Sequence, residues 1–459
     1  MRALLLITFL AWLSMAATAQ PPLKQEQKMF PYPYTIDDLP NGLRLVTVQT
    51  DYPNLVALYI VVNTGSRNEV ESGKSGYAHL FEHVMFRGSQ NYTPEKRDAI
   101  LKLAGASSNA YTSDDRTVYH EVFAREDLDE ILKMEADRFL QLKYSPDVYR
   151  TETQAVLGEY NKNSANPFSK LHEKLRETAF DKHTYKHTTM GFLKDIEDMP
   201  NQFNYSQEFY RRYYRPENTT IVLAGDVTRE QALGIVKRHF GDWKRGDFAP
   251  SIPVEPEQKA PRTAHVEWPS PTLPHIAIAF RGPAYSDEKK DKAALDLLAA
   301  IAFGENSDLY RRLALKEQKV DLLEVSFDNQ VDPELFTVFA RIKDPKDVDY
   351  ARDQILDAFK RYTKELVPQQ KLDETRSRLR YSMALAMNSS EAIASALAPF
   401  IALRRTPETI NQLFALYQRI TPEDIRAAAS KYFVDDHRTI VTLSSEVQGA
   451  GDAQQGGQN

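Results

Sequence analysis

The predicted order of strands and helices over residues 34–242 starts again after residue 262, and this repetition limits the chain to folds built from two similar units. Residues 43–48 alternate between apolar and polar side chains, and residues 55–62 form a nearly continuous apolar run, so both are predicted strands. The other predicted elements are helices at 126–142, 148–162 and 292–303, strands at 219–225, 265–268, 276–280, 336–342 and 439–443, and two long helical stretches before the last strand. The sequence therefore predicts an α+β fold of two similar α+β domains that arose by internal duplication.

A segment of linker composition separates the two predicted domains. Residues 246–262 carry four prolines among several charged residues. We therefore expect an N-terminal domain over residues 27–245, a linker over 246–262, and a C-terminal domain of the same fold over 263–445. The last residues, 446–459, are rich in Gly and Gln, which predicts a disordered tail.

The first 19 residues have the three parts of a secretory signal peptide. Arg2 supplies a charged start, residues 3–17 form an apolar stretch, and Ala17-Thr18-Ala19 is a cleavage site of the A-x-A type. The alternative, an uncleaved anchor, needs about 20 apolar residues to span a bilayer, whereas this stretch has about 15. We therefore expect cleavage before Gln20, export, and no stable membrane insertion.

The cysteine count agrees with this expectation. The chain contains no Cys, so it forms neither a disulfide framework nor a thiolate metal site, and no cysteine after the signal can carry a lipid. An exported chain of this kind suits the periplasm of a Gram-negative-type bacterium.

Composition excludes several classes of protein. With 42% hydrophobic and 27% charged residues among 459, the chain is neither disordered, nor collagen-like, nor a polytopic membrane protein. Its 58 Lys and Arg residues are outnumbered by 64 Asp and Glu residues, and they form no long basic run. Because phosphate neutralisation needs a basic surface, we expect no nucleic-acid partner.

The sequence His79-Leu80-Phe81-Glu82-His83 is the sharpest indication of chemistry. It lies in an apolar stretch, residues 77–86, that predicts a helix, in which residues four apart share a face. His79 and His83 can thus present two imidazole nitrogens to one metal ion, with the Glu82 carboxylate beside them. This order is the inverted form of the H-E-x-x-H zinc motif. The alternatives are a buried histidine pair or a chance match, and chance gives roughly 0.02 matches in a chain of this composition.

A catalytic zinc site needs a third protein ligand and an open fourth position. Glu152 and Glu159 are candidates because they are seven residues apart and lie on roughly the same face of the predicted helix 148–162. Acidic residues on an exposed helix face are usually only solvated. These residues alone therefore leave the identity of the third ligand open.

Taken together, these features resemble the pitrilysin and insulinase family of zinc peptidases, and more specifically its short branch, which is similar to the mitochondrial processing peptidase. Glu159 follows His83 by 76 positions, and Glu152 precedes Glu159 by seven. Three further stretches carry the resemblance: Gly105 to Thr112 with Thr117 and Tyr119, Ala179 to Gly191, and Tyr213 to Asn218 with Gly225 to Val227. The resemblance covers residues 35–445 and is strong in the first half and loose in the second.

The resemblance implies one zinc ion per chain, bound by His79, His83 and Glu159, with Glu82 as the general base. It implies that Glu152 orients one of the ligands. The N-terminal domain is then the zinc-binding catalytic domain, and the two domains face each other as a clam shell around a chamber. The implied activity is that of a zinc endopeptidase, which hydrolyses short or unfolded peptides in the periplasm.

The resemblance also places Asn109 and Ala110 on an edge strand that pairs with the backbone of an extended peptide. By itself, Ser107-Ser108-Asn109 is typical of a turn, so the residues alone favour the other interpretation. The acidic pair Asp114-Asp115 follows. Two interpretations of this pair stay open, a preference for basic substrate residues and simple solvation.

The chain departs from the family pattern in its second half. Single-chain relatives carry an arginine and a tyrosine, seven residues apart, that reach the substrate, and the matching positions here are Ala314 and Asp321. Either a related partner subunit or a second copy of the chain supplies these groups, or the alignment of this stretch is shifted. The absence of such donors raises the activation free energy of the reaction by several kcal/mol, at roughly 3 kcal/mol for one oxyanion donor.

Two other classes of function remain as alternatives. The first is a non-catalytic scaffold or assembly subunit of the same family, although such members typically lose motif residues and the five candidate positions are intact here. The second is a metal-storage or transport protein, which is typically rich in clustered histidines. The ten histidines of this chain are scattered instead.

Overall fold

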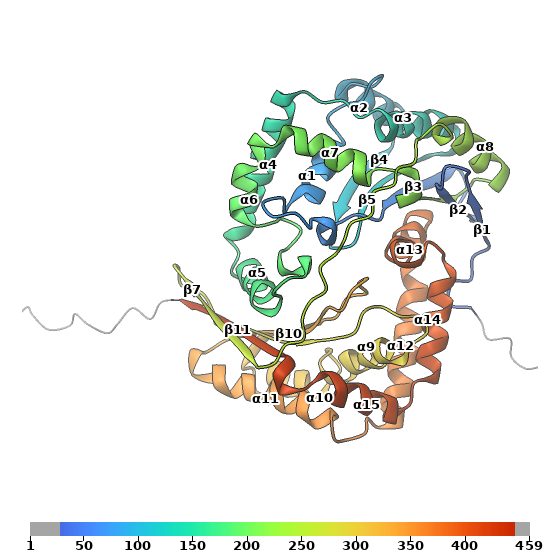
Figure 1. Ribbon diagram of the computed structural model, residues 1–459. Helices are drawn as coiled ribbons and strands as arrows, with labels where there is room; N and C mark the ends of the chain where they lie inside the picture. The colour runs from blue at the N-terminus through green and yellow to red at the C-terminus, as the bar shows by residue number, and fades with distance from the viewer. Residues whose placement is uncertain (1–27, 446–459) are drawn as a thin grey trace, which may run out of the picture.

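The computed structural model describes residues 28–445 and contains two sheets, each with its own helices (Figure 1). The expected signal peptide, residues 1–19, and the expected tail, residues 446–459, lie outside the described residues. Residues 246–261 carry no helix or strand and connect the two halves. Among the described residues, no helix combines the length and the apolar character that a membrane span requires.

The first sheet has six strands in the order β1-β2-β6-β3-β5-β4, so that β1 and β4 are its edges. Its strands are β1 (Tyr34–Asp38), β2 (Arg44–Gln49), β3 (Leu55–Val62), β4 (Ser107–Thr112), β5 (Thr117–Ala124) and β6 (Thr219–Gly225). β2 runs parallel to β6, and the other neighbouring pairs are antiparallel. β3 is central and has helices on both faces, which explains why its apolar run is nearly continuous.

Eight helices belong to the chain between β3 and the linker. They are α1 (Tyr77–Val84), α2 (Pro94–Leu103), α3 (Leu128–Leu140), α4 (Pro146–Ser164), α5 (Pro167–Ala179), α6 (Leu193–Asp198), α7 (Phe203–Tyr213) and α8 (Arg229–Phe240). Several begin where the sequence offers a cap. The Ser145 hydroxyl accepts a hydrogen bond from the Val148 backbone N–H, and Pro146 takes the first helical position of α4.

The second sheet repeats this arrangement with five strands in the order β7-β11-β8-β10-β9. They are β7 (Arg262–Trp268), β8 (His275–Arg281), β9 (Val320–Ser326), β10 (Leu335–Ile342) and β11 (Arg438–Ser445). β7 pairs in parallel with β11, as β2 does with β6, and β9 is an edge strand, as is β4. The prediction of two similar α+β domains is therefore confirmed.

The helices of the second half are more numerous than predicted. They are α9 (Lys290–Ala302), α10 (Asp308–Tyr310), α11 (Val348–Tyr362), α12 (Gln369–Ala386), α13 (Ser390–Arg404), α14 (Glu408–Arg419) and α15 (Pro422–Tyr432). Five of these lie between β10 and β11, where two long helical stretches were predicted, so that prediction was wrong. The breaks carry ordinary signals: Ser389 caps α13, and Thr421 caps α15 just before Pro422.

One helix from each half packs against the sheet of the other half (Figure 1). Leu397 and Ile401 of α13 share a hydrophobic core with Val46, Ala57 and Val61 of the first sheet. Conversely, α5 packs on the second sheet, and the residues of that core include Leu171, Leu175, Ala277, Val441 and Leu443. Each half therefore covers one face of the other half's sheet, the first half through α5 and the second through α13.

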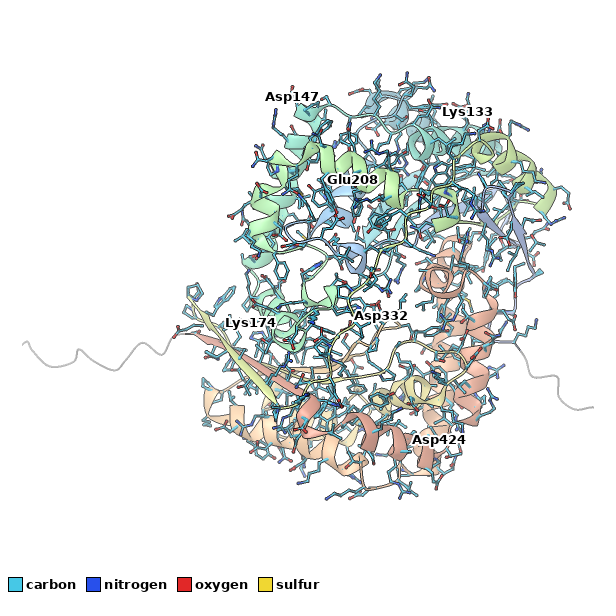
Figure 2. The ribbon with its side chains drawn as sticks, in the orientation of Figure 1. Lys133, Asp147, Lys174, Glu208, Asp332 and Asp424 are labelled. Carbon is cyan, nitrogen blue, oxygen red and sulfur yellow. The ribbon has the colours of Figure 1, made fainter. Side chains whose placement is uncertain are left out.

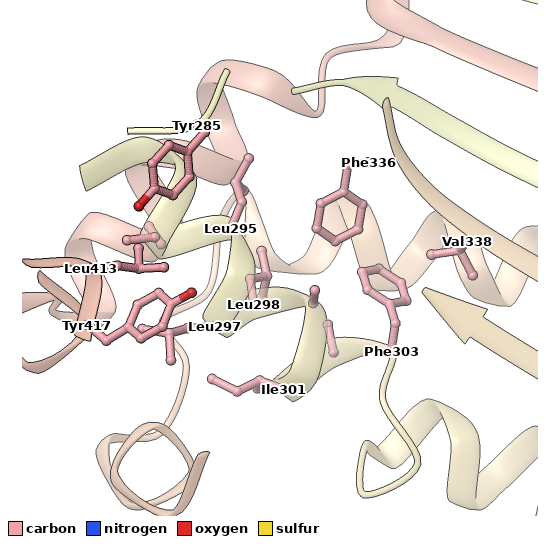
Figure 3. Close-up of a cluster of buried hydrophobic side chains, with 14 of the residues drawn as sticks. Tyr285, Leu295, Leu297, Leu298, Ile301, Phe303, Phe336, Val338, Leu413 and Tyr417 are labelled. Atoms are coloured by element: carbon pink, nitrogen blue, oxygen red, sulfur yellow. The ribbon is translucent and has the colours of Figure 1, made fainter. Parts of the chain in front are cut away.

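The outer face of the second sheet packs on α9, as the close-up in Figure 3 shows. Leu295, Leu298 and Ile301 of this helix lie beside Phe336 and Val338 of β10 in one apolar cluster. The first sheet covers its outer face with α1, α3 and α8 in the same way. In the first half, however, one of these covering helices carries the polar motif.

Candidate metal centre

Helix α1 presents both motif histidines on one side. The rings of His79 and His83 meet edge to face with centroids 4.9 Å apart. The start of the helix is fixed by Glu69, whose carboxylate accepts hydrogen bonds from the backbone N–H groups of Gly76 and Ala78, both at 2.7 Å. Gly76 has φ of 92°, and a Cβ there would lie 2.8 Å from the Met190 carbonyl oxygen, so this position requires glycine.

Helix α4 brings the third candidate ligand to this pair. Glu159 Oε2 lies 3.5 Å from His79 Nε2 and 3.6 Å from His83 Nε2. Zinc bonds of about 2.0–2.1 Å at tetrahedral angles separate ligand atoms by about 3.3 Å, so two nitrogens and one oxygen at these distances fit a zinc ion. Among the described residues, this is the one group of three ligand-type side chains whose ligand atoms lie so close, within 4.8 Å of one another.

The two imidazoles have pKa values shifted in opposite directions. Burial lowers the pKa of His79 to about 4, and the neighbouring His83 adds to this shift. His79 is therefore neutral at neutral pH, with a lone pair available for a metal. The pKa of His83 is raised, chiefly by its interaction with Glu152. The acidic groups around this ring therefore favour its protonated form.

Glu152 lies behind His83, on the side away from Glu159. Its Oε2 is 3.6 Å from His83 Nδ1, and its Oε1 is 2.6 Å from Nε of Arg87. Burial opposes ionisation of this carboxyl, but His83 and Arg87 outweigh it and lower its pKa. Glu152 thus contacts Arg87 and lies beside Nδ1 of the His83 ring, whereas Nε2 of the same ring faces Glu159.

Glu82 occupies the turn of α1 between the two histidines and accepts a hydrogen bond of 2.6 Å from the Thr112 hydroxyl. Burial raises the pKa of Glu82, and Thr112 and His83 moderate the rise. Because its pKa is raised, this carboxyl takes up a proton more readily than an exposed glutamate does.

Asn109 and Ala110 lie in β4, at the edge of the first sheet, rather than in a turn. β4 pairs with β5, where Asn109 is opposite His120 and Ala110 is opposite Tyr119. The other edge of β4 has no strand beside it among the described residues. The Ala110 backbone N–H donates to Asn109 Oδ1 at 2.9 Å, so an added strand would displace this contact, which lies on the same strand as Thr112.

Two models of one protein family match this chain. The model described as "Insulinase (Peptidase family M16)" matches residues 44–192, and the one described as "Peptidase M16 inactive domain" matches residues 204–379. The chain belongs to the insulinase family, peptidase family M16. The family resemblance that the motif indicated is confirmed, and the first model covers the stretch that supplies the three candidate ligands.

Relatives of this M16 chain match it over most of its length. "Zinc protease PqqE" of Helicobacter pylori is 27% identical over 414 residues, which are 88% of this chain and 91% of the relative. "Probable mitochondrial-processing peptidase subunit beta" of Arabidopsis thaliana is 24% identical over 444 residues, with coverages of 93% and 81%. A crystal structure of a protease from Helicobacter pylori is 27% identical and covers 90% of this chain and 99% of its own, with a TM-score of 0.83. A relative named as a protease therefore shares this fold, and a relative named as a zinc protease matches most of the sequence.

The second half of this M16 chain supplies neither an arginine nor a tyrosine at the two positions compared above. Ala314 lies in a short π-helical turn, Arg311–Lys316, and packs against the hydrophobic core. Asp321 lies in β9 and forms an ion pair with Arg341 of the neighbouring strand at 2.8 Å. Both side chains are thus engaged within their own half.

Neither interpretation of the acidic pair after β4 agrees with the structure. Asp114 and Asp115 are 8% and 6% exposed, so they are not solvated surface residues and do not face a peptide. Asp114 pairs with Arg176 through two contacts of 3.0 Å, and Asp115 accepts a hydrogen bond from the Tyr185 hydroxyl at 2.8 Å. Both carboxylates instead hold the chain segment that follows the edge strand.

The sequence offered no clear signal for three residues that complete the site. Thr112 contacts Glu82, Arg87 contacts Glu152, and Glu69 caps α1. Arg87 lies three residues beyond the end of α1 at Val84, so helical spacing gave no indication of its contact with Glu152. The other two depend on contacts between separate elements.

Proposed function

We propose that this chain is a zinc-dependent endopeptidase that hydrolyses short or unfolded peptides. The observation that carries the proposal is the convergence of His79, His83 and Glu159 beside the Glu82 carboxylate. The relatives named as zinc proteases support the same conclusion. The domain over residues 27–245 holds one zinc ion, the domain over 263–445 holds none, and residues 246–262 link them.

The chemistry follows from the groups in place. His79, His83 and Glu159 would hold a zinc ion, which would lower the pKa of a bound water molecule and would polarise the carbonyl group of the peptide bond. Glu82 would accept the proton of the attacking water and donate it to the leaving amine. Glu152 would orient the His83 ring, and the neutral His79 would offer a lone pair as a ligand.

The edge strand favours extended substrates. A peptide that adds to β4 is held by backbone hydrogen bonds, with Asn109 and Ala110 at the contact, and such bonds read no particular sequence. Folded proteins rarely offer a free strand of this kind, whereas short and unfolded peptides do. Substrate selection by conformation therefore fits this site better than selection by one side chain.

A related subunit, or a second copy of this chain, completes the site in this proposal. Ala314 and Asp321 offer no donor to a developing oxyanion, and a donor from another chain replaces the missing pair. One relative is named as the beta subunit of a processing peptidase, which supports an assembly of related chains. We place the enzyme in the periplasm because of the signal-peptide pattern of residues 1–19.

The test uses the chain from Gln20 onward and its Glu82→Gln variant. Elemental analysis should give one zinc ion per chain in both proteins. A library of quenched peptides should be cleaved by the wild type and cleaved about 10²–10⁴-fold more slowly by the variant, because the general base is lost. Glu230→Gln, which changes an exposed carboxylate on α8, serves as the matched control and should match the wild type.

Two other results would contradict the proposal. Zinc binding without cleavage, both alone and with a related subunit, would favour a scaffold or assembly subunit. Absence of bound zinc would exclude the metallopeptidase mechanism. Measurement of mass in solution by sedimentation, with and without the candidate subunit, distinguishes a homodimer from a mixed pair.

A further inference from the structure

Strand β4 reaches the proposed general base through its last residue, Thr112, whose hydroxyl and backbone N–H both face the Glu82 carboxylate. Thr112 is the last residue of β4, and its Oγ1 donates a hydrogen bond of 2.6 Å to Glu82 Oε2. Asn109 and Ala110 precede it on the same strand, at the open edge of the sheet. One short strand therefore carries both the peptide-binding edge and a contact to the carboxylate that transfers the proton.

The chain just after Thr112 is held tightly within the first half. The backbone N–H groups of Ser66 and Arg67 donate to the carbonyl oxygens of Ser113 and Asp114 at 3.3 and 2.8 Å. Gly65 packs so closely there that a Cβ would lie 2.1 Å from the Ser113 carbonyl oxygen. A donor at position 112 is thus fixed in space by its neighbours rather than by Glu82 itself.

The second half holds the same segment from the other side. The side-chain amide of Gln330 donates to Asp114 Oδ2 at 3.1 Å, and the Val331 backbone N–H donates to Asp115 Oδ2 at 2.8 Å. Asp114 is at the same time paired with Arg176 of α5. These buried contacts leave the end of β4 little freedom to move relative to α1.

A fixed donor restricts the carboxylate that it contacts. Glu82 reaches the site on a side chain with three rotatable bonds, and a hydrogen bond to Oε2 selects among its rotamers and leaves Oε1 for proton transfer. Proton transfer depends steeply on this placement, since a misplacement of about 1 Å can cost about 100-fold in rate. Thr112 itself does not need to contact the peptide bond that is cleaved.

We propose that Thr112 is a positioning residue, which fixes Glu82 in its reactive orientation and couples the strand that receives the peptide to the group that transfers the proton. This inference rests on the proposed function. The two remain separable because the orientation of Glu82 can be observed without turnover.

Three substitutions at position 112 test the inference. Thr112→Val removes the hydroxyl and keeps the shape, Thr112→Ala removes it without adding volume in case the valine variant does not fold, and Thr112→Ser keeps it. Thr363→Val is the matched control, because its hydroxyl donates to a backbone carbonyl oxygen at the surface of the second half. Each protein is assayed for zinc content, kcat and KM, and each is crystallised.

We expect Thr112→Val and Thr112→Ala to lower kcat about 10–100-fold, with KM within about threefold of the wild type and one zinc ion still bound. Thr112→Ser should recover most of the loss, and Thr363→Val should show none. Equal losses in the serine and valine variants, or a kcat within about threefold of the wild type in both hydroxyl-free variants, would overturn the inference. Loss of zinc would also overturn it, because the effect would then be structural.

The crystal structures decide the matter without any activity. Glu82 should keep its contact with residue 112 in the wild type and the serine variant, and should leave this position in the valine and alanine variants. An unchanged Glu82 in the hydroxyl-free variants contradicts the inference even if the chain cleaves no peptide. A wild type that cleaves no peptide contradicts the proposed function alone.

Discussion

The two halves of the molecule share a sheet order and differ in the helix that follows their central strand. After β3, α1 carries the buried His79 and the half-buried Glu82 and His83. After β8, α9 offers Leu295 and Leu298 to its core instead (Figure 3). The fold is therefore complete without the polar motif, so structural need does not account for the ionisable groups of α1.

Polar groups do occur in the second half, but they have partners within the fold. Lys292 of α9 is 1% exposed, forms an ion pair with Asp296, and lies over the Phe327 ring at 4.0 Å. Asp296 also accepts a hydrogen bond from Tyr417 at 2.9 Å. Each charge of this cluster is satisfied by a neighbouring side chain, whereas the ligand atoms of His79, His83 and Glu159 converge on one another.

Substitution of a histidine should affect zinc content and cleavage in the first half and not in the second, and this is the largest effect we expect. His83→Ala removes one of three zinc ligands, so we expect bound zinc to fall from one ion per chain to nearly none and cleavage to fall at least about 1000-fold. His265→Gln changes an exposed histidine of β7 that contacts Thr442 and should leave both values unchanged. Elemental analysis and peptide cleavage measure the two effects, and zinc loss in the second variant would contradict the comparison.

The buried lysine of the second half should matter for stability and not for chemistry. Lys292→Met leaves Asp296 buried without its cation, so we expect the free energy of unfolding to fall by about 3–5 kcal/mol. Lys290→Met, on the same helix, removes an exposed ion pair with Asp424 and should cost at most about 1 kcal/mol. Urea titration measures both. Cleavage per folded molecule should stay at the wild-type level in each variant, and a loss of turnover would place α9 in the active site.

The contribution of Asp332 to stability, through its contacts between the two halves, should depend on pH. Asp332 lies between them (Figure 2), and its Oδ2 is 2.5 Å from Nε of Arg67 and 3.0 Å from Nε2 of His183. Burial opposes ionisation of this carboxyl, but His183 and Arg67 outweigh it and lower its pKa to about 2 from 3.8. Because the folded pKa lies below the unfolded one, the contribution of Asp332 is present above pH 3.8 and is lost as the pH falls toward 2.

Asp332→Asn should therefore reduce the free energy of unfolding by about 1–3 kcal/mol at pH 7, the smallest of these effects, and by less at pH 3. Urea titrations at the two pH values measure this difference. Asp436→Asn, which changes an exposed carboxylate near the C-terminus of the fold, should differ from the wild type by less than about 0.5 kcal/mol at both. A deficit that stays constant with pH would show that Asp332 acts through packing and not through its charge.

Local patterns predicted seven of the eleven strands in the described residues, but they gave no strand at β1, β5 or β9 and favoured a turn at β4. The predicted strands 55–62 and 219–225 coincide with β3 and β6 residue for residue. Between β10 and β11 the same approach joined five helices into two stretches, because caps such as Ser389 change the backbone without interrupting the apolar pattern. Helix number in that region is set by short signals that periodicity does not detect.

In the candidate site, too, the residues that depend on local sequence were predictable, and those that depend on packing between elements were not. His79 and His83 follow from one helical spacing, whereas the place of Glu159 depends on how α4 packs against α1. The error at Asp114 has a similar origin, since its partners Arg176 and Gln330 lie 62 and 216 positions away in the chain. A charged residue after a strand looks solvated until the elements that cover it are known.

The packing of α5 and α13 on the sheet of the opposite half has a consequence for biosynthesis. The apolar face of the first sheet is covered only when α13, which ends at Arg404, has been made, long after β6 ends at Gly225. At a synthesis rate of about 5–20 residues per second, this interval lasts about 10–35 s. During that time the apolar face of the first sheet is accessible to chaperones and proteases. A product truncated before residue 390 lacks α13 and therefore has no helix of its own to cover this face.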